Sequence, residues 1–257
     1  MKNFRKKLKP YLPQWLMRPY SWARVVRLRL VTFVPAYNED ELMTGYVCPF
    51  MEDRHFISCY DAAVKDGLAV SPTIHWRAHV FSWAAKRALD LEGDFVECGV
   101  NRGFLSRIAI DYIGFAKQDK KFYLMDTYEG LVDRYITNEE RIRGVAGGGY
   151  EPCYEQVLRT FSPYKNVQLV KGPIPDTLPE VMSSKIAFLS IDMNCVMPEI
   201  AAAEYFWPRM VSGGVIVLDD YGHAGHELQQ EAFDKFALEH GVSILCLPTG
   251  QGLIFKL

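Results

Sequence analysis

The sequence predicts an α/β fold: a mostly parallel, seven-stranded sheet with helices on both faces and an antiparallel hairpin at its C-terminal end. From residue 95 onward, short apolar runs of strand length alternate with longer segments of helical periodicity, which is the pattern of consecutive β-α units. The last two apolar runs, residues 242–247 and 252–256, are joined through Pro248-Thr249-Gly250. Because so short a connection cannot cross the sheet, these two strands must pair antiparallel.

The remaining elements follow in order along the chain. Residues 35–49 carry turn residues and few periodic apolar side chains, which indicates a linker, and residues 56–67 have the pattern of a short helix. Ser71 followed by Pro72 predicts the N-cap and first turn of a longer helix that ends near Gly93. Five parallel strands are then expected over residues 95–98, 121–125, 167–171, 186–191 and 215–218. The helices after them are expected over residues 103–116, 151–161, 175–182, 198–210 and 227–240.

One main domain with an N-terminal extension is expected from this pattern. Residues 1–45 form a basic arm and linker, and residues 46–257 form the α/β domain. Within the domain, residues 128–150 are a polar, glycine-containing insertion that interrupts the β-α alternation beside the predicted ligand site. Long loops in this position often cover a ligand, so we interpret the insertion as a candidate lid.

The charge of the chain is unevenly distributed. Nine of its 29 basic residues precede the first acid, Glu39, so the other 20 basic residues face all 31 acids. An acidic body argues against binding of nucleic acid. Tryptophan and aliphatic side chains lie between the basic residues of the arm, a pattern compatible with peripheral contact with an anionic membrane surface, with a partner subunit, or with the protein's own acidic domain. A homo-oligomer is expected.

The cysteines and the hydropathy predict the cellular compartment. The six cysteines are scattered, include no Cys-x-x-Cys pair and lie largely in apolar runs, so we expect reduced, buried thiols. No apolar stretch approaches the length of a bilayer span, and the N-terminus lacks the apolar centre of a signal peptide. These observations predict a cytoplasmic protein, and they leave peripheral membrane contact through the arm open.

The turn after the first parallel strand indicates a ligand site. Glu97 lies at the end of the strand, Gly99 and Gly103 are four residues apart, and a helix starts at the second glycine. Such a turn lets the backbone approach a ligand and exposes free N–H groups at the start of the helix. The spacing differs from the G-x-G-x-x-G of dinucleotide-binding folds and suits a ligand without a pyrophosphate, such as S-adenosylmethionine. A strand-to-helix turn without any ligand is the alternative.

Asp126 ends the second parallel strand and is the predicted ribose ligand. Its carboxylate can accept hydrogen bonds from both ribose hydroxyls of the cofactor, or it can cap the following segment instead. Neighbouring positions at the strand ends complete the predicted cofactor-binding set, which is Glu97, Cys98, Gly99, Gly103, Asp126, Thr127, Gly172 and Asp192.

Three acids end the fourth and fifth strands, Asp192 on one and Asp219 and Asp220 on the other. Because neighbouring parallel strands end at the same edge of a sheet, these carboxylates should converge and repel one another unless a cation or protons neutralise them. Oxygen ligands of this kind suit Mg²⁺, whereas helix capping and ion pairs with Lys or Arg are the alternatives. Asp192 and His223, on the loop after the fifth strand, are the candidate catalytic bases, and His226 is a further one.

Four motifs resemble the macrocin O-methyltransferase family, the TylF/MycF-type sugar methyltransferases. They are residues 94–100 (DFVECGV), 125–130 (MDTYEG), 190–194 (SIDMN) and 213–221 (GGVIVLDDY). The resemblance covers roughly residue 71 to the C-terminus and implies the class I methyltransferase variant of the Rossmann-like fold, which the strand and helix order also matches. It further implies methylation of a hydroxyl, usually on a deoxysugar, that depends on S-adenosylmethionine and Mg²⁺.

The resemblance also assigns roles to individual residues. Cofactor positions of the family match Glu97, Gly99 and Asp126, and its metal-binding acids match Asp192, Asp219 and Asp220. The chain departs from the family at Met193-Asn194, where relatives tend to carry Gly-Asp, and at Asn101 and Phe104, where an aromatic and a small residue are common. These departures bear on the substrate more than on the cofactor.

The predicted function is therefore O-methylation of a hydroxyl on a small-molecule or glycan acceptor, with a vicinal diol of a sugar as the leading candidate. The acceptor could belong to an antibiotic sugar, a cell-surface polysaccharide, a lipid-linked glycan or a phenol. A nucleotide-dependent oxidoreductase is one alternative, against which the glycine spacing and the terminal hairpin argue. A non-catalytic module that binds S-adenosylmethionine is the other.

Overall fold

The computed structural model describes residues 35–69, 71, 73–144 and 149–257, which fall into two compact units that divide between Cys48 and Pro49. The described part of the first unit contains an antiparallel hairpin of β1 (Tyr37–Glu39) and β2 (Leu42–Thr44). This hairpin corrects the linker expected here. Asp40 and Glu41 close the turn with left-handed backbone conformations, the geometry of a tight two-residue hairpin, although neither is a glycine. The basic arm before residue 35 lies outside the described residues.

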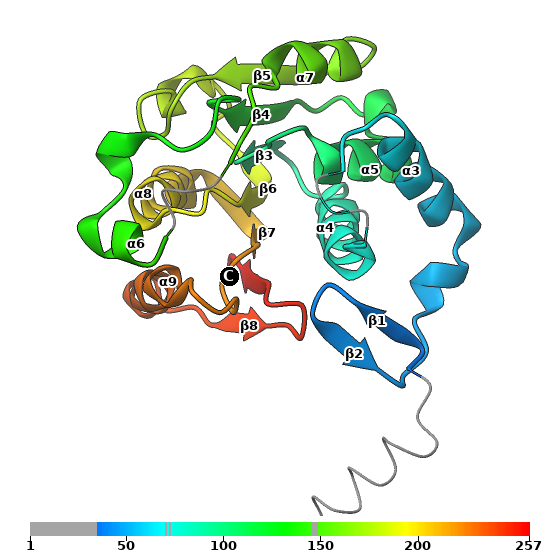
Figure 1. Ribbon diagram of the computed structural model, residues 1–257. Helices are drawn as coiled ribbons and strands as arrows, with labels where there is room; N and C mark the ends of the chain where they lie inside the picture. Colours follow the sequence, from blue (N-terminus) through cyan, green and yellow to red (C-terminus); the bar gives the residue numbers. More distant parts are fainter. Residues whose placement is uncertain (1–34, 70, 72, 145–148) are drawn as a thin grey trace, which may run out of the picture. The chain divides into compact units, whose positions relative to one another are not determined.

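The second unit is a seven-stranded sheet with helices on both faces (Figure 1). Its strand order is β5-β4-β3-β6-β7-β9-β8, and all neighbouring pairs are parallel except β7 with β9 and β9 with β8. The strands are β3 (Asp94–Cys98), β4 (Phe122–Asp126), β5 (Val167–Lys171), β6 (Ile186–Ile191), β7 (Met210–Leu218), β8 (Ile244–Cys246) and β9 (Gly252–Phe255). The predicted α/β class and the terminal antiparallel hairpin are confirmed.

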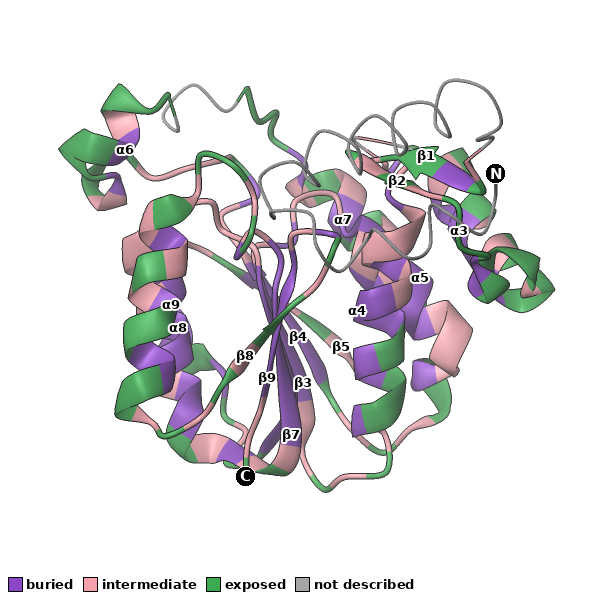
Figure 2. Cartoon of the chain, turned by 90° about the horizontal axis from the view of Figure 1, so that it is seen from below, coloured by how far each residue is buried: buried purple, intermediate pink, exposed green. Residues whose placement is uncertain are grey.

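The two faces of the sheet are covered by different helices (Figure 2). One face packs against α8 (Val196–Phe206) and α9 (Glu227–Glu239). The other packs against α4 (His75–Ala88), α5 (Phe104–Ile113) and α7 (Tyr154–Phe161), and α3 (Arg54–Lys65) packs on α5. Because both faces are covered, the central strand β6 is buried at every residue, which explains why all its residues except Ser190 are apolar.

Several boundaries differ from the sequence expectations. The helix α4 begins at His75, and its N-cap residue Ile74 makes no side-chain hydrogen bond, so the cap predicted at Ser71 is wrong. The helix expected over residues 175–182 is only a short 3-10 turn, Leu178–Glu180. The insertion, residues 128–150, contains the 3-10 turn Asp133–Tyr135 and the five-residue helix α6 (Asn138–Ile142), which the sequence analysis had not separated from the loop.

The strand order fixes where a ligand can bind. Strand β3 lies between β4 and β6. The chain continues from β3 to β4 and β5 on one side and then returns to place β6 on the other side, so the strand order reverses at β3. In open parallel sheets such a switch point opens a crevice outside the carboxyl ends of the strands. Asp126 ends β4, and Asp192 and Asp219 follow directly after β6 and β7, so the predicted acids lie along this edge. No helix among the described residues is long and apolar enough to span a membrane.

Candidate active site

A hollow of about 170 Å³ opens at the carboxyl ends of β3, β4, β5 and β6. Five residues of the predicted cofactor set line it: Gly99, Asp126, Thr127, Gly172 and Asp192. The insertion contributes Leu131, Val132, Tyr135 and Tyr150, and the loop into α8 contributes Met193, Asn194 and Cys195, with Pro198 from the helix itself. Five of the eight predicted cofactor residues thus line a concavity, Glu97, Cys98 and Gly103 are not among its lining residues, and the insertion forms part of its wall.

Asp126 organises the turn on which the hollow rests. Its Oδ2 accepts hydrogen bonds from the backbone N–H groups of Val100 and Asn101, both at 2.7 Å, and its Oδ1 accepts one from the N–H of Tyr128 at 2.6 Å. A carboxylate offers about four lone-pair positions, so one position on Oδ1 remains for a ligand hydroxyl. The hydroxyl of Thr127 lies 3.3 Å from that oxygen but donates its hydrogen to Gly130 at 2.6 Å. The ribose role stays a prediction, with room for one direct hydrogen bond.

The glycines of the turn are required by close packing. A Cβ on Gly99 would lie 1.8 Å from the carbonyl oxygen of Asp192, and one on Gly103 would lie 2.5 Å from the ring of Phe161. Both residues also have positive φ, 91° and 79°. Gly99 thus brings the end of β3 against the end of β6, and Gly103 lets α5 start beneath α7. The predicted contact of these two glycines with a cofactor is compatible with this packing and stays a separate prediction.

Glu97 and Cys98 point to opposite sides of the sheet. The side chain of Cys98 is packed in the core on the α8 side, where burial first, then Glu97 and Asp126, raise the pKa of its thiol. Glu97 is 3% exposed, and its Oε2 has no hydrogen-bond partner in the described part of the chain. Burial, with added repulsion from Asp126 and Asp219, raises the pKa of Glu97 well above its ordinary value. A buried carboxyl without a partner is costly, so Glu97 is poised for a donor group.

Asp192, Asp219 and Asp220 form the second feature of the site, here named the acid cluster. One carboxylate oxygen of each lies within 4.8 Å of the others, as the strand-end argument predicts. Burial and the two neighbouring acids raise the pKa of Asp192 well above its ordinary value. Burial and the charge of Asp219 raise the pKa of Asp220 to about 7. The cluster is thus under electrostatic strain that a bound cation would relieve.

Two residues missed by the sequence analysis hold Asp219 in place. The guanidinium of Arg77, on α4, lies 2.7 Å from Asp219 Oδ2 in an ion pair that is largely buried. The side-chain amide of Gln251 donates to Asp219 Oδ1 at 2.9 Å, and Gln251 accepts a hydrogen bond from Thr249 at 3.0 Å. The turn of the terminal hairpin therefore reaches the acid cluster. The ion pair with an arginine was an open alternative for these acids, and it occurs together with the cluster.

The two loop histidines occupy different positions. His226 Nδ1 lies 3.7 Å from Asp220 Oδ2 and 2.9 Å from the side-chain amide of Gln229. Burial, followed by the nearby His223, lowers the pKa of His226. The ring of His223 packs over Gly250, where a Cβ would lie 2.6 Å from it, and its Nε2 is buried with no partner among the residues that the structure describes. Of the two, His226 is the one in ion-pair distance of the acid cluster, whereas the predicted base was His223.

Tyr150, at the end of the insertion, lies where the hollow meets the acid cluster. It lines the hollow and is partly exposed. Burial, followed by the charges of Asp192 and Asp220, raises the pKa of its hydroxyl. The phenol is therefore protonated at neutral pH and available as a hydrogen-bond donor near these acids. Nothing in the sequence marks Tyr150 beyond its place at the end of the insertion.

Comparison with known proteins agrees with this geometry. A sequence model of the macrocin O-methyltransferase (TylF) family matches residues 81–245, well over half of the chain. The 8-demethyl-8-(2,3-dimethoxy-alpha-L-rhamnosyl)-tetracenomycin-C 4'-O-methyltransferase of Streptomyces olivaceus is 29% identical over 139 residues, which are 50% of this chain and 53% of that protein. The chain thus spans about half the length of this curated relative.

Solved structures show the same fold at low identity. The O-methyltransferase NovP has a TM-score of 0.64 at 17% identity, over 86% of this chain and 87% of its own. The calicheamicin methyltransferase CalS11 has a TM-score of 0.59 at 16% identity, over 96% of both chains. These neighbours carry the class I methyltransferase architecture predicted from the sequence. With the family match across the hollow and the acid cluster, the chain belongs to the macrocin O-methyltransferase (TylF) family.

Proposed function

We propose that this protein is an S-adenosylmethionine-dependent O-methyltransferase that acts on a hydroxyl of a sugar or of a glycosylated acceptor, with Mg²⁺ held by the acid cluster. The observation that carries the proposal is the convergence of Asp192, Asp219 and Asp220 within 4.8 Å directly beside the hollow at the switch point of the sheet. Asp192 belongs to both features, so a methyl donor in the hollow and a hydroxyl on the cation would meet at its side chain.

The hollow fits S-adenosylmethionine in its chemistry. Asp126 keeps one open acceptor position for a ribose hydroxyl at the rim of the turn. Glu97, which ends β3 but is not among the residues that line the hollow, has a buried carboxyl whose Oε2 has no partner among the described residues and could accept from an ammonium group that reached it. The N–H groups of Val100 and Asn101 are already bound by Asp126, so these two donors of the turn are not available to a pyrophosphate. This last point also argues against a dinucleotide-dependent oxidoreductase.

The acid cluster fits a hard divalent cation. Its three carboxylates and the guanidinium of Arg77 sum to a formal charge of −2 when all are ionised. Carboxylate oxygens are the preferred protein ligands of Mg²⁺. A bound Mg²⁺ would orient a substrate hydroxyl and lower its pKa. Asp192 would be the residue to accept the hydroxyl proton, and His226, whose Nδ1 lies 3.7 Å from Asp220 Oδ2, would be a second base near the cluster.

A sugar hydroxyl is the proposed acceptor because of the relatives. The Streptomyces olivaceus protein is named as a methyltransferase of a rhamnosyl tetracenomycin, and CalS11 is also described as a TDP-rhamnose 3'-O-methyltransferase. Small-molecule glycosides and polysaccharides are both within this class. The departures at Met193 and Asn194, which line the hollow, are where this chain could differ in acceptor from those enzymes.

Calorimetric titration tests the proposal. We expect S-adenosylhomocysteine to bind, NAD not to bind, and Mg²⁺ to be required for methyl transfer to a rhamnoside diol. Binding of S-adenosylhomocysteine without transfer to any of a panel of glycosides, with Mg²⁺ present, would favour the non-catalytic cofactor-binding module. Binding of NAD in preference to S-adenosylhomocysteine would overturn the proposal in favour of the oxidoreductase.

A further inference from the structure

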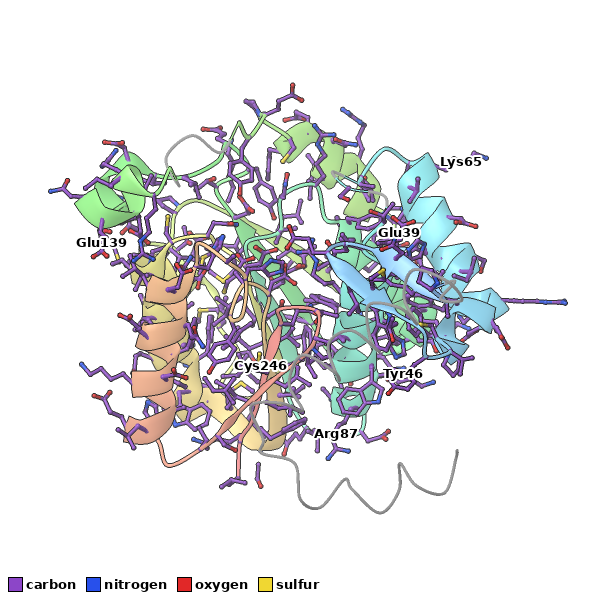
Figure 3. The ribbon with its side chains drawn as sticks, turned by 60° about the horizontal axis from the view of Figure 1, so that its bottom comes forward. Glu39, Tyr46, Lys65, Arg87, Glu139 and Cys246 are labelled. Carbon is purple, nitrogen blue, oxygen red and sulfur yellow. The ribbon has the colours of Figure 1, made fainter. Side chains whose placement is uncertain are left out.

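Glu140 is a buried carboxylate that joins the insertion to the body of the domain. It lies on α6 and is 1% exposed, whereas the preceding Glu139 is exposed at the outer surface of the same helix (Figure 3). Its Oε2 accepts hydrogen bonds from the N–H and the hydroxyl of Thr137, both at 2.7 Å, which completes a capping box at the start of α6. Its Oε1 accepts a third hydrogen bond, 2.7 Å long, from the N–H of Val196.

Val196 is the first residue of α8, and its N–H is one of the donors that a helix cannot satisfy internally. The local N-cap residue, Cys195, makes no side-chain hydrogen bond to the helix. The cap is supplied instead by Glu140, 56 residues earlier in the chain, and its negative charge also suits a helix N-terminus. The start of α8 therefore depends on the insertion for its capping.

This hydrogen bond connects two walls of the hollow. The residues that lead into α8, Met193 to Cys195, line the hollow, and so do Leu131, Val132 and Tyr135 of the insertion. Other polar links from residues 133–143 of the insertion to the described body are exposed: Arg143 with Glu227 at 2.8 Å, Arg134 with Asp176, and the hydroxyl of Tyr135 with Asp176 at 2.6 Å. Exposed ion pairs contribute little to stability, so among these contacts the buried hydrogen bond of Glu140 contributes most to holding α6 against the body.

We infer that Glu140 is a positioning residue: by capping α8 it holds the loop Met193–Cys195 and the insertion in one arrangement and so fixes the shape of the hollow for its ligand. The identity of that ligand rests on the proposed function, whereas the coupling of the two walls does not. A purely structural anchor would stabilise the protein without any effect on binding in the hollow.

The variant Val196→Pro isolates this hydrogen bond. Proline is well tolerated at the first position of a helix, and Cys195, with φ −141° and ψ 131°, already has the extended conformation favoured before proline. The substitution removes the N–H and leaves the Glu140–Thr137 capping box in place. Val196→Ala keeps the N–H and is the matched control.

Hydrogen exchange and S-adenosylhomocysteine affinity are the two measurements. Relative to Val196→Ala, we expect Val196→Pro to exchange roughly tenfold faster or more at residues 138–143 and 193–197, as the loss of a charge-assisted hydrogen bond implies, and to bind S-adenosylhomocysteine at least several-fold more weakly. Equal exchange in the two variants would overturn the coupling. Faster exchange with unchanged affinity would overturn the positioning role. If the wild-type protein binds no S-adenosylhomocysteine, the proposed cofactor fails, while the exchange data still decide the coupling.

A second pair of variants tests the same inference if Val196→Pro does not fold. Glu140→Gln removes the charge and one acceptor of the buried contact, and Glu139→Gln makes the same change at the exposed neighbour on α6. We expect faster exchange at residues 193–197 and weaker S-adenosylhomocysteine binding only for Glu140→Gln. Identical behaviour of the two glutamine variants would overturn the inference.

Discussion

Replacement of Arg77 by methionine should destabilise the protein strongly, because it leaves a buried carboxylate without its counter-charge. The side chain of Asp219 is 3% exposed, and its ion pair with Arg77 is 2.7 Å long. Removal of one partner from a buried pair costs about 3–5 kcal/mol. Since the side chain of Arg77 is 19% exposed and Gln251 still donates to Asp219, we expect the lower end, about 3 kcal/mol.

The assay is urea unfolding in excess chelator for the wild type, Arg77→Met, Asp219→Asn and the double variant. In Asp219→Asn, the amide oxygen can still accept from Gln251. The double variant buries no unpaired charge, so its loss of stability should be smaller than the sum of the single losses by about 1–3 kcal/mol. A loss below about 1 kcal/mol for Arg77→Met, or additive effects in the cycle, would refute the buried-pair argument.

Addition of Mn²⁺ tests the proposed cation site independently of the ion pair. Without Arg77, the acid cluster has one more uncompensated negative charge, so a saturating divalent cation should raise the melting temperature of Arg77→Met more than that of the wild type. Differential scanning fluorimetry with and without the metal measures this. If Mn²⁺ shifts neither protein, the cation proposal fails, while the stability cycle still tests the pair.

Three further predictions concern the acids. Substitution of any member of the acid cluster by asparagine should abolish methyl transfer and leave the Kd for S-adenosylhomocysteine within a few fold, and a chelator should act likewise; full turnover in excess EDTA would contradict this. Asp126→Ala should weaken S-adenosylhomocysteine binding and also lower the Tm, because three backbone N–H groups lose their acceptor; a cofactor Kd equal to that of the wild type would reject the ribose assignment. Burial, then Asp220, raises the pKa of Glu199, and Glu140 adds to this while the N–H of Met193 opposes it. The folded protein therefore favours neutral Glu199. The free energy of unfolding should be greatest below the pKa that Glu199 has in the unfolded chain and should fall as pH rises through its pKa in the folded protein. Chemical denaturation from pH 5 to 8 measures this, and Glu199→Gln should show a flatter dependence on pH.

The architecture and the acids could be read from the sequence because both depend on local pattern. Apolar runs of strand length alternate with helical segments, and each parallel strand must end at the same edge, so acids placed after strands are brought together by topology. Asp192, Asp219 and Asp220 meet for this reason. The same logic placed Asp126 and Gly172 on the wall of the hollow.

Residues that act across the fold were harder to find. Arg77 does carry a signal, since it stands four residues before Phe81 and eleven before Ala88, in line with the buried stripe of α4. A charged residue in such a stripe needs a buried partner, but the sequence does not name it. Gln251 has no comparable signal, because its distance of 32 residues from Asp219 has meaning only once β9 is paired with β7.

Gly99 shows that one sequence feature can have more than one physical cause. Its spacing with Gly103 was read as room for a ligand, yet a Cβ there would meet the carbonyl oxygen of Asp192 at 1.8 Å. The N–H of Asp192 also donates to the carbonyl of Cys98 at 2.9 Å, so the ends of β3 and β6 are in backbone contact at this point. An alanine at residue 99 would push these strand ends apart and would also be strained at φ 91°. The absence of a side chain at Gly99 is therefore what places an acid of the cluster on the wall of the hollow, and the proposed cofactor and cation sites depend on one another through the backbone of this residue.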